Sequence, residues 1–242
     1  VPAVIAGIEN WNIAFEEAGF INAVVAKIQP EDAEWDAADY DYNVVRWSSE
    51  PDGNLLGIGP SVSNPLTGEI ISADVVNKLL AIKLGYNYRK LYGYTEDNDP
   101  LMQYITNLTL HEVGHVLGLR HNFRGSYLYS PDEIHDKNIT GNVLMSSVMD
   151  YDPINIAPEG VEQGIYFSTE PGVYDKWAVK FGYTPNLTDE ERTALLQQSV
   201  KRELTFGTDD DAMSYPGNNI DPRTKRYDMS NDPIGYAEDI VK

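Results

Sequence analysis

The stretch Leu110–Asn122, LHEVGHVLGLRHN, constrains this chain more than any other part of it. It fits the pattern H-E-x-x-H-x-x-G-x-x-H. His111 and His115 are four residues apart, so on a helix both imidazoles can point toward one ion. Gly118 tolerates the left-handed conformation that ends a helix. As the chain then turns back, His121 can supply a third nitrogen.

The donor set of this motif favours a catalytic zinc ion over a structural one. Three protein ligands and a water form the open arrangement of catalytic zinc, whereas structural zinc is usually closed by four side chains, several of them cysteines. The chain has no cysteine, and three of its four histidines fall within these eleven residues. Glu112 is offset from the histidines and can reach a water on the metal. We therefore expect one catalytic zinc site.

Composition restricts the partners. A chain of 242 residues fits one large domain or two small ones. Its formal net charge of −20 disfavours nucleic acid and anionic membranes as partners. No apolar run is long enough to span a bilayer, so we expect no membrane insertion. The absence of cysteine suits a secreted or periplasmic bacterial protein, although it does not exclude the cytosol.

The first half of the chain predicts a helix, several strands and two more helices. Residues 3–18 form an amphipathic pattern that ends at Gly19, a residue typical of helix C-termini. The other expected elements are strands at 21–28, 42–47 and 69–76, an extended segment at 55–62, an acidic loop at 32–41, a turn at 64–68 and helices at 78–92 and 101–117. This order predicts an α/β half-domain.

The second half is less regular. We expect a loop at 122–140 that contains His135, with a solvated histidine favoured over a second metal ligand. Helices are expected at 168–183 and from a capping box at Thr188–Glu191 to about Leu204. From residue 206 onward the pattern indicates an extended tail. Asp209–Asp211 is a weakly supported candidate for Ca²⁺, and a solvated acidic loop is the favoured alternative.

Together with Ser147–Tyr151 (SVMDY), the histidine motif resembles the metzincin clan of zinc endopeptidases. In that clan a methionine-bearing turn lies beneath the three histidines, and Met149 would be that methionine. Tyr151 matches the position at which astacin-like and serralysin-like members carry a tyrosine near the zinc.

The rest of the chain is similar to the met-zincin domain of large bacterial zinc-dependent metalloproteases. The residues that carry this similarity are the segments 11–20 (WNIAFEEAGF), 42–47 (YNVVRW), 59–61 (GPS), 64–75 (NPLTGEIISADV) and 221–228 (DPRTKRYD). Members of that family carry a long N-terminal region. The resemblance therefore implies that this chain is a catalytic domain from a longer precursor.

The resemblance implies an α+β, metzincin-like zincin fold. Residues 1–121 would form an N-terminal subdomain with a twisted mixed sheet, two long helices and the active-site helix. Residues 122–242 would form a mostly helical and irregular C-terminal subdomain below the cleft. With zinc held by the three histidines, Glu112 would act as general base and then general acid. Tyr151 would either hydrogen-bond the developing oxyanion or simply pack at the turn, and Met149 would support the histidines by packing.

The resemblance also places the substrate. An extended peptide would add to the edge strand at 55–62, so Gly57, Ile58 and Gly59 are candidate substrate-binding residues. The segment 153–157 would wall the pocket next to the cleaved bond, and Ile154 suggests that this pocket is apolar.

Four functions follow from these observations. The leading one is a zinc endopeptidase that acts on peptides or proteins. A zinc amidase acting on a non-protein amide, such as a cell-wall peptide, is the second, and the sequence does not separate the two. A non-catalytic binding module is disfavoured by the intact Glu112, which a binding module does not need. A structural zinc protein would require a fourth closing ligand, and no residue suggests one.

Overall fold

A computed structural model describes residues 1–49, 56–212 and 221–241 of the chain. The chain forms two compact units. The first consists of Val1–Glu9 and Val24–Leu119, and the second of Asn10–Ala23 and Arg120–Lys242. Each combines helices with irregular chain, and the first also holds a small mixed sheet. The predicted α+β fold class is thus confirmed.

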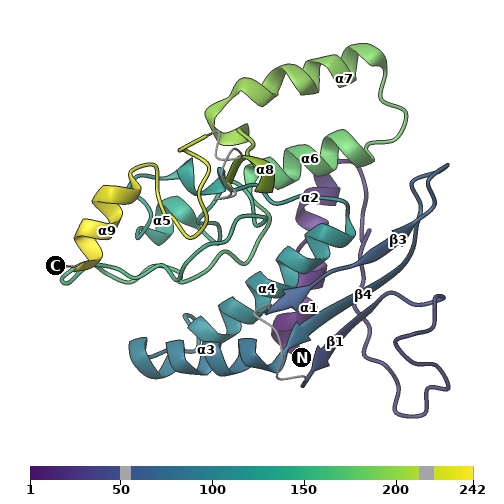
Figure 1. Cartoon of the computed structure of the whole chain (residues 1–242), viewed down its shortest axis with the longest axis horizontal. Coiled ribbons are helices and arrows are strands. Elements are labelled where there is room, and N and C mark those ends of the chain that lie inside the picture. The colour runs from purple at the N-terminus through teal and green to yellow at the C-terminus, as the bar shows by residue number, and fades with distance from the viewer. Residues whose placement is uncertain (50–55, 213–220, 242) are drawn as a thin grey trace. The chain divides into compact units, whose positions relative to one another are not determined.

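The first unit is built around one long strand. Its elements are α1 (Pro2–Glu9), β1 (Val44–Ser48), β2 (Gly57–Ile58), β3 (Ser61–Ser63), β4 (Ile70–Lys78), α3 (Leu79–Tyr92) and α4 (Pro100–Val116). Strand β4 pairs in parallel with β1 and antiparallel with both β2 and β3, which share its other edge (Figure 1). The register places Val44 opposite Asp74 and Gly57 opposite Asn77. The sheet order β1-β4-β2 therefore leaves β2 at the end of the sheet.

Helix α4 is the centre of this unit. It packs against β4 and β2 on one side, and both α1 and α3 pack against it (Figure 1). Buried Asn77 of β4 donates a hydrogen bond to the hydroxyl of Thr109 across this contact (3.1 Å). Gly7 of α1 lets the helices approach closely, because a β-carbon there would lie 2.6 Å from Cβ of Thr109. The helix that carries the motif is thus fixed on several faces.

The second unit is mostly helical and irregular. Its elements are α2 (Asn12–Glu17), η1 (Gly125–Leu128), α5 (Lys137–Thr140), α6 (Val173–Tyr183), α7 (Asp189–Leu196), η2 (Gln197–Val200), η3 (Arg202–Leu204), α8 (Asp209–Ala212) and α9 (Pro233–Val241). Helix α2 packs on α6, with the rings of Phe15 and Tyr183 5.0 Å apart. A separate apolar core joins Ile134, Leu144, Met145, Ile165, Met229 and Tyr236.

Several predicted local signals are confirmed. Gly19 has φ +92°, and the amide of Phe20 donates to the carbonyl of Phe15 (3.0 Å), as expected for a helix that ends at a left-handed glycine. The box at Thr188 begins α7, because its hydroxyl accepts from the amide of Glu191 while the Glu191 carboxylate accepts from the amide of Thr188. The acidic loop at 32–41 and the turn at 64–68 are also present.

Two predictions about the first 28 residues need correction. The single helix at 3–18 is two helices, α1 and α2, because the side chain of Asn10 donates to the carbonyl of Thr169 (2.7 Å) and the chain breaks there. The predicted buried strand at 21–28 is wrong. Ile21 and Ile28 are 85% and 70% exposed, and the amide of Ala26 donates to the carboxylate of Glu9 rather than to a neighbouring strand. A β-branched run forms a strand only where a partner strand is in reach.

The predicted boundaries in the second half also shift. Ser168 does not begin a helix, because its hydroxyl is buried and accepts from the amide of Leu144 (2.8 Å); α6 begins at Val173, after Gly172. Helix α7 ends at Leu196 and is followed by two 3₁₀ turns. The expected extended tail is wrong in part, because it contains the short helix α8 and the nine-residue helix α9.

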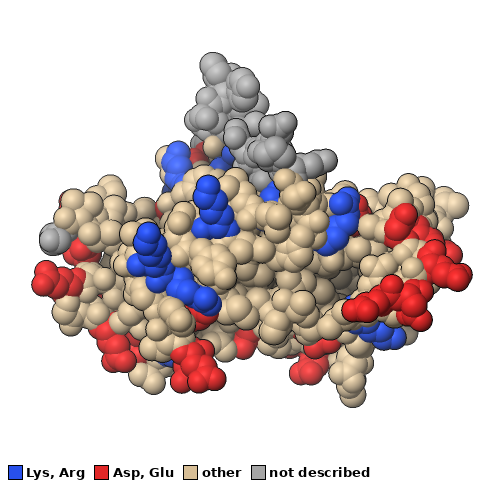
Figure 2. Space-filling model, turned by 90° about the horizontal axis from the view of Figure 1, so that it is seen from below, with Lys and Arg blue, Asp and Glu red and all other residues tan. Residues whose placement is uncertain are grey.

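No helix in the described ranges is long and apolar enough to span a bilayer. Charge is distributed unevenly on the surface. Figure 2 shows one face on which Lys and Arg side chains stand among uncharged residues, while Asp and Glu side chains gather toward its margins. The net charge of −20 therefore does not imply a uniformly acidic surface.

Candidate metal centre

The motif helix begins and ends with defined caps. The carboxylate of Asp99 accepts a hydrogen bond from the amide of Leu101 (3.0 Å), and Pro100 occupies the first turn, where its missing N–H costs nothing. Gly118 has φ +88°, and the amide of Leu119 donates to the carbonyl of Gly114 (3.0 Å). The predicted helix with a glycine stop is therefore confirmed, and the chain leaves α4 just before His121.

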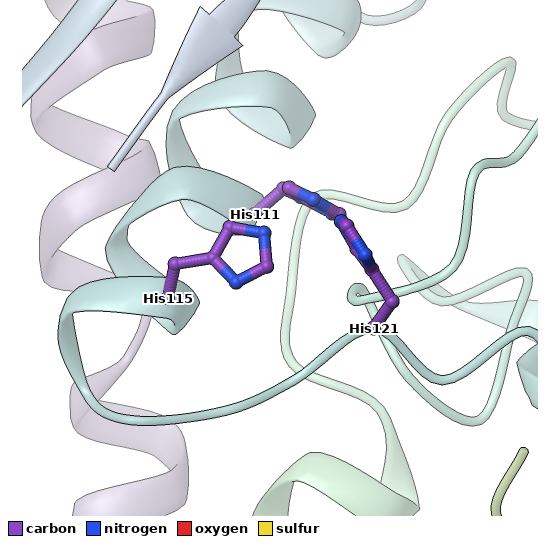
Figure 3. A group of neighbouring side chains, drawn as sticks. All are labelled: His111, His115 and His121. Carbon is purple, nitrogen blue, oxygen red and sulfur yellow. The ribbon is translucent and has the colours of Figure 1, made fainter. Parts of the chain in front are cut away.

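The three histidines of the motif lie together. One ring nitrogen from each of His111, His115 and His121 lies within 4.8 Å of the other two, and this is the one such group of possible metal ligands in the described ranges. Two rings project from α4 and the third from the segment that follows it, all toward a common point (Figure 3). The rings of His111 and His115 are nearly perpendicular, with centroids 4.8 Å apart. Three imidazoles without a thiolate fit zinc.

Hydrogen bonds fix the orientation of two of these rings. Nδ1 of His115 lies 3.0 Å from the carbonyl oxygen of Leu119, which can only accept, so this nitrogen carries the proton. Nδ1 of His121 lies 2.8 Å from a carboxylate oxygen of Asp209. In both residues Nε2 is consequently the nitrogen that would ligate a metal.

Glu112 is a buried carboxylic acid beside the histidines. Its side chain belongs to α4, the residue is 5% exposed, and burial raises its pKa to about 7. Strand β2 lies directly against it, because a β-carbon on Gly57 would lie 2.5 Å from Oε1 of Glu112. A β-carbon on Gly59 would lie 2.2 Å from the Glu112 carbonyl oxygen. The two glycines thus allow the edge strand to approach the glutamate.

The roles predicted for the edge strand stay predictions, but its position is consistent with them. Ile58 is 46% exposed and pairs with Val76 of β4. Leu55, at the start of the predicted segment 55–62, lies outside the described residues. Ile154 is half-buried, and the pocket expected around it also stays a prediction.

The Ser147–Tyr151 segment forms a tight turn in the second unit. The amide of Asp150 donates to the carbonyl of Ser147 (3.4 Å), and Met149 is fully buried. The buried carboxylate of Asp175 accepts from the hydroxyl of Ser147 (2.6 Å) and from the amide of Val148 (2.8 Å). Burial raises the pKa of Asp175 to about 6, against the effect of these donors.

Asn122 connects this turn to the ligand His121. Its amide donates to the carbonyl of Met149 (3.0 Å). Its fully buried side chain donates to the carbonyl of Thr205 and accepts from the amide of Gly207, each at 3.1 Å. Sequence reasoning did not single out this residue, although an asparagine directly after the third histidine is a local signal that was available.

Tyr151 lies beside His121. The two ring centroids are 4.7 Å apart, and Phe123 contacts both rings. Tyr151 also stacks on Tyr227, with centroids 5.7 Å apart and an interplanar angle of 27°. Tyr151 therefore contacts both a metal-site histidine and an aromatic residue of the C-terminal segment.

The weaker metal candidates have other partners. His135 is not solvated as predicted but buried, with its ring stacked 5.8 Å from Tyr236, and burial lowers its pKa. Within Asp209–Asp211, the first carboxylate contacts His121, the second pairs with Arg120 (3.3 Å) and the third accepts from the amide of Thr208 (3.0 Å). These separate contacts give no support for a calcium site.

This fold and histidine cluster define a metalloprotein of the zincin type. Residues 94–242, more than half of the chain, match the family described as Met-zincin, and the chain belongs to that family. The resemblance drawn from the sequence is confirmed in this range, which contains the histidine motif, the SVMDY turn and the segment 221–228. Comparisons with curated proteins and with solved structures found no match. The family implies zinc, and the three histidines are positioned to bind it.

Proposed function

We propose that the chain is a zinc endopeptidase in which Glu112 acts as general base and then general acid. The observation that carries this proposal is the clustering of three histidine nitrogens, with a buried carboxylate as the next residue after the first histidine. A structural zinc site would have no use for this carboxylate. Hydrolysis needs a proton acceptor at this position.

The residues divide the chemistry among them. His111, His115 and His121 would hold a zinc ion, which when bound lowers the pKa of a water molecule and polarises the scissile carbonyl. Glu112 would accept the proton released as water attacks the carbonyl carbon. It would then deliver this proton to the nitrogen of the leaving amine. The peptide bond breaks to give a carboxylate and an amine.

Tyr151 is the candidate donor to the oxyanion that develops on the carbonyl oxygen. Its ring contacts the ring of His121, which supports a position next to the reacting group. A single oxyanion donor typically contributes about 2–4 kcal/mol to transition-state stabilisation. Met149 takes no chemical role in this proposal and acts by packing.

An extended peptide is the substrate that the edge strand favours. Strand β2 is at the end of the sheet order and lies against Glu112, and Ile58 between the two glycines is exposed. A peptide added along this strand would form main-chain hydrogen bonds and pass the glutamate. We further propose that the protein is secreted or periplasmic and is made as part of a longer precursor. We propose that it does not bind nucleic acid.

The proposal is tested by exposing zinc-loaded wild type and Glu112→Ala to a quenched-fluorescent peptide library and to cell-wall fragments. Metal analysis should give about one zinc per chain for both proteins, because Glu112 is not a ligand. We expect only the wild type to cleave peptides. Cleavage of cell-wall fragments alone would indicate an amidase. Zinc binding without turnover of either substrate would indicate a binding module.

A further inference from the structure

The segment Asp221–Ser230 (DPRTKRYDMS) returns to the surroundings of His121 in the second unit. The side chain of Asp221 accepts from Arg124 (3.3 Å), three residues after His121. Six residues later, the amide of Tyr227 donates to the carbonyl of Tyr151 (3.0 Å). The segment is thus attached at two points to parts of the chain that border the histidine site.

Arg226 of this segment contacts both groups that support the ring of His121. Its guanidinium donates to one oxygen of Asp209 (3.2 Å), while the other oxygen of Asp209 accepts from Nδ1 of His121 (2.8 Å). The same guanidinium lies over the ring of Phe123, 5.0 Å from its centroid. Phe123 in turn stacks on His121, with centroids 5.0 Å apart and an interplanar angle of 23°.

The backbone next to Arg226 is held in an unusual conformation. Tyr227 has φ +63°, in the left-handed region that residues with a β-carbon seldom adopt. Its side chain is 68% exposed, so burial of apolar surface does not explain why it is kept there. Its amide and its ring both contact Tyr151. Non-glycine residues in this region often occur at functional sites, where contacts determine the conformation.

We propose that Asp209 and Arg226 are positioning residues for the metal ligand His121. Asp209 holds the Nδ1 proton and so presents Nε2 to the metal, and Arg226 holds Asp209 in place. A carboxylate behind a ligating histidine fixes its orientation and raises its basicity, and losing such a partner typically costs 10–100-fold in metal affinity. The inference rests on the proposed function only where it gives the metal a role in hydrolysis. The positioning of His121 for metal binding does not depend on that role.

The two residues should differ in the size of their effect. The Arg226 and Asp209 side chains are about one-third exposed, and exposed ion pairs contribute little by themselves. The hydrogen bond between Asp209 and His121 is shorter, and the His121 side chain is only 17% exposed. Loss of the Asp209 charge should therefore weaken metal binding more than loss of Arg226.

The chain offers a matched control for each residue. Asp210 is the neighbour of Asp209 and pairs with Arg120 at an exposed position. Arg223 lies in the same segment as Arg226 and pairs with Asp221, again with an exposed side chain. The test measures zinc dissociation constants, by competition with a chromophoric chelator, for Asp209→Asn, Asp209→Glu, Asp210→Asn, Arg226→Gln and Arg223→Gln.

We expect Asp209→Asn to weaken zinc binding 10–100-fold, Asp209→Glu to recover part of this loss, and Arg226→Gln to give a smaller loss. Both controls should stay within about twofold of the wild type. The visible absorption of the cobalt-substituted protein should change for Asp209→Asn and not for Asp210→Asn, because it reports ligand geometry. Circular dichroism melts should show folded proteins throughout.

Unchanged zinc affinity and an unchanged cobalt spectrum in Asp209→Asn would overturn the inference. So would equal losses in Asp209→Asn and Asp210→Asn, since these would indicate a general effect of net charge. None of these measurements requires turnover. If the metal affinities behave as expected and no peptide is cleaved, the positioning role stands and the proposed endopeptidase function fails.

Discussion

Gly57 lies so close to Glu112 that a β-carbon at position 57 would be 2.5 Å from Oε1 and 2.9 Å from the carboxyl carbon. At Gly59 the conflicting atom is instead the backbone carbonyl oxygen of Glu112, at 2.2 Å. A carboxylate can rotate away from an added methyl group, whereas the backbone of a buried helix cannot. The two glycines should therefore respond differently to substitution.

We predict that Gly57→Ala lowers kcat/KM by roughly tenfold or more with little loss of stability, because it displaces the proposed general base. Zinc affinity should not change. Gly59→Ala should instead lower the free energy of unfolding by about 1–3 kcal/mol, since the strand or the helix must shift. Urea unfolding, metal competition and peptide hydrolysis separate the two effects.

The matched control for both is Gly182→Ala. Gly182 lies in α6 of the second unit, and apart from its chain neighbours and its own helix backbone no atom would lie within 4 Å of an added β-carbon. This variant should keep its activity and gain slightly in stability, because alanine favours the helix. Full activity in Gly57→Ala would mean that the edge strand does not constrain Glu112.

Asn122 should contribute both to stability and to metal binding. Replacing it with alanine leaves the carbonyl of Thr205 and the amide of Gly207 without their buried partner, at a cost of about 2–3 kcal/mol in the free energy of unfolding. Zinc affinity should fall as well, because the segment next to His121 loosens. Urea unfolding and metal competition measure these two effects.

The corresponding control is Asn138→Ala. Asn138 is exposed and bonds the nearby carboxylate of Asp136, so its substitution should change stability by no more than about 0.5 kcal/mol. An Asn122→Ala protein with wild-type stability would show that these hydrogen bonds are replaced by water.

Tyr151→Phe distinguishes the two roles open to this tyrosine. The substitution removes the hydroxyl and keeps the ring contacts to His121 and Tyr227. If the hydroxyl donates to the developing oxyanion, kcat/KM should fall by a factor equivalent to about 2–4 kcal/mol at constant zinc affinity. Wild-type kinetics in Tyr151→Phe would leave only the packing role.

Asp228 should make stability depend on pH. Its carboxylate is largely buried, and burial raises its pKa from 3.8 to about 6, against the opposing effect of the Ser126 hydroxyl. Burial likewise raises the pKa of Asp150, and the charge of Asp228 adds to this effect. Between about pH 4 and 6 the folded state thus binds more protons than the unfolded chain. The stabilisation from Asp228 is complete below pH 4 and lost as pH rises through about 6.

Asp228→Asn should reduce the loss in the free energy of unfolding between pH 4 and pH 6.5 by about 2 kcal/mol, because the amide does not titrate. Urea unfolding of both proteins at pH 4 and pH 6.5 and constant salt gives the comparison. Asp152, whose pKa is raised to about 7, acts in the same direction in both proteins, so the difference between them reports Asp228 together with its effect on Asp150. Parallel pH profiles would contradict the prediction.

The site could be predicted from sequence where its geometry is local. His111, Glu112 and His115 share one helix, so their spacing determines which of them face the same point. Gly118 and His121 follow His115 by three and six residues. The same applies to the capping box at Thr188, whose two hydrogen bonds join residues three apart.

The support of the site could not be predicted, because it depends on long-range contacts. Asp209 is 88 residues from His121, and Arg226 is a further 17 residues away. In the sequence, Asp209 is one of three consecutive acids, which is typical of a solvated loop. Only the folded chain shows that Asp209 contacts a histidine, whereas Asp210 and Asp211 contact other groups.

The errors in the fold predicted from sequence have a similar origin. The run at 21–28 has the composition of a strand, but a strand also needs a neighbour, and β1 takes the available edge of β4 instead. The break between α1 and α2 arises from the hydrogen bond that the Asn10 side chain donates to the carbonyl of Thr169, 159 residues away. Helix α9 is amphipathic but only nine residues long, and it follows a segment rich in Gly, Asp and Pro, whose composition indicates an extended tail.

The most direct test of the central claim is peptide hydrolysis before and after removal of the metal. A single peptide selected from the library is incubated with native protein, chelator-treated protein, and treated protein supplied with one equivalent of zinc. We predict that cleavage is lost on treatment and restored at one equivalent, while Glu112→Ala binds the same equivalent and stays inactive. Cleavage that persists without metal, or that survives in Glu112→Ala, would contradict the account.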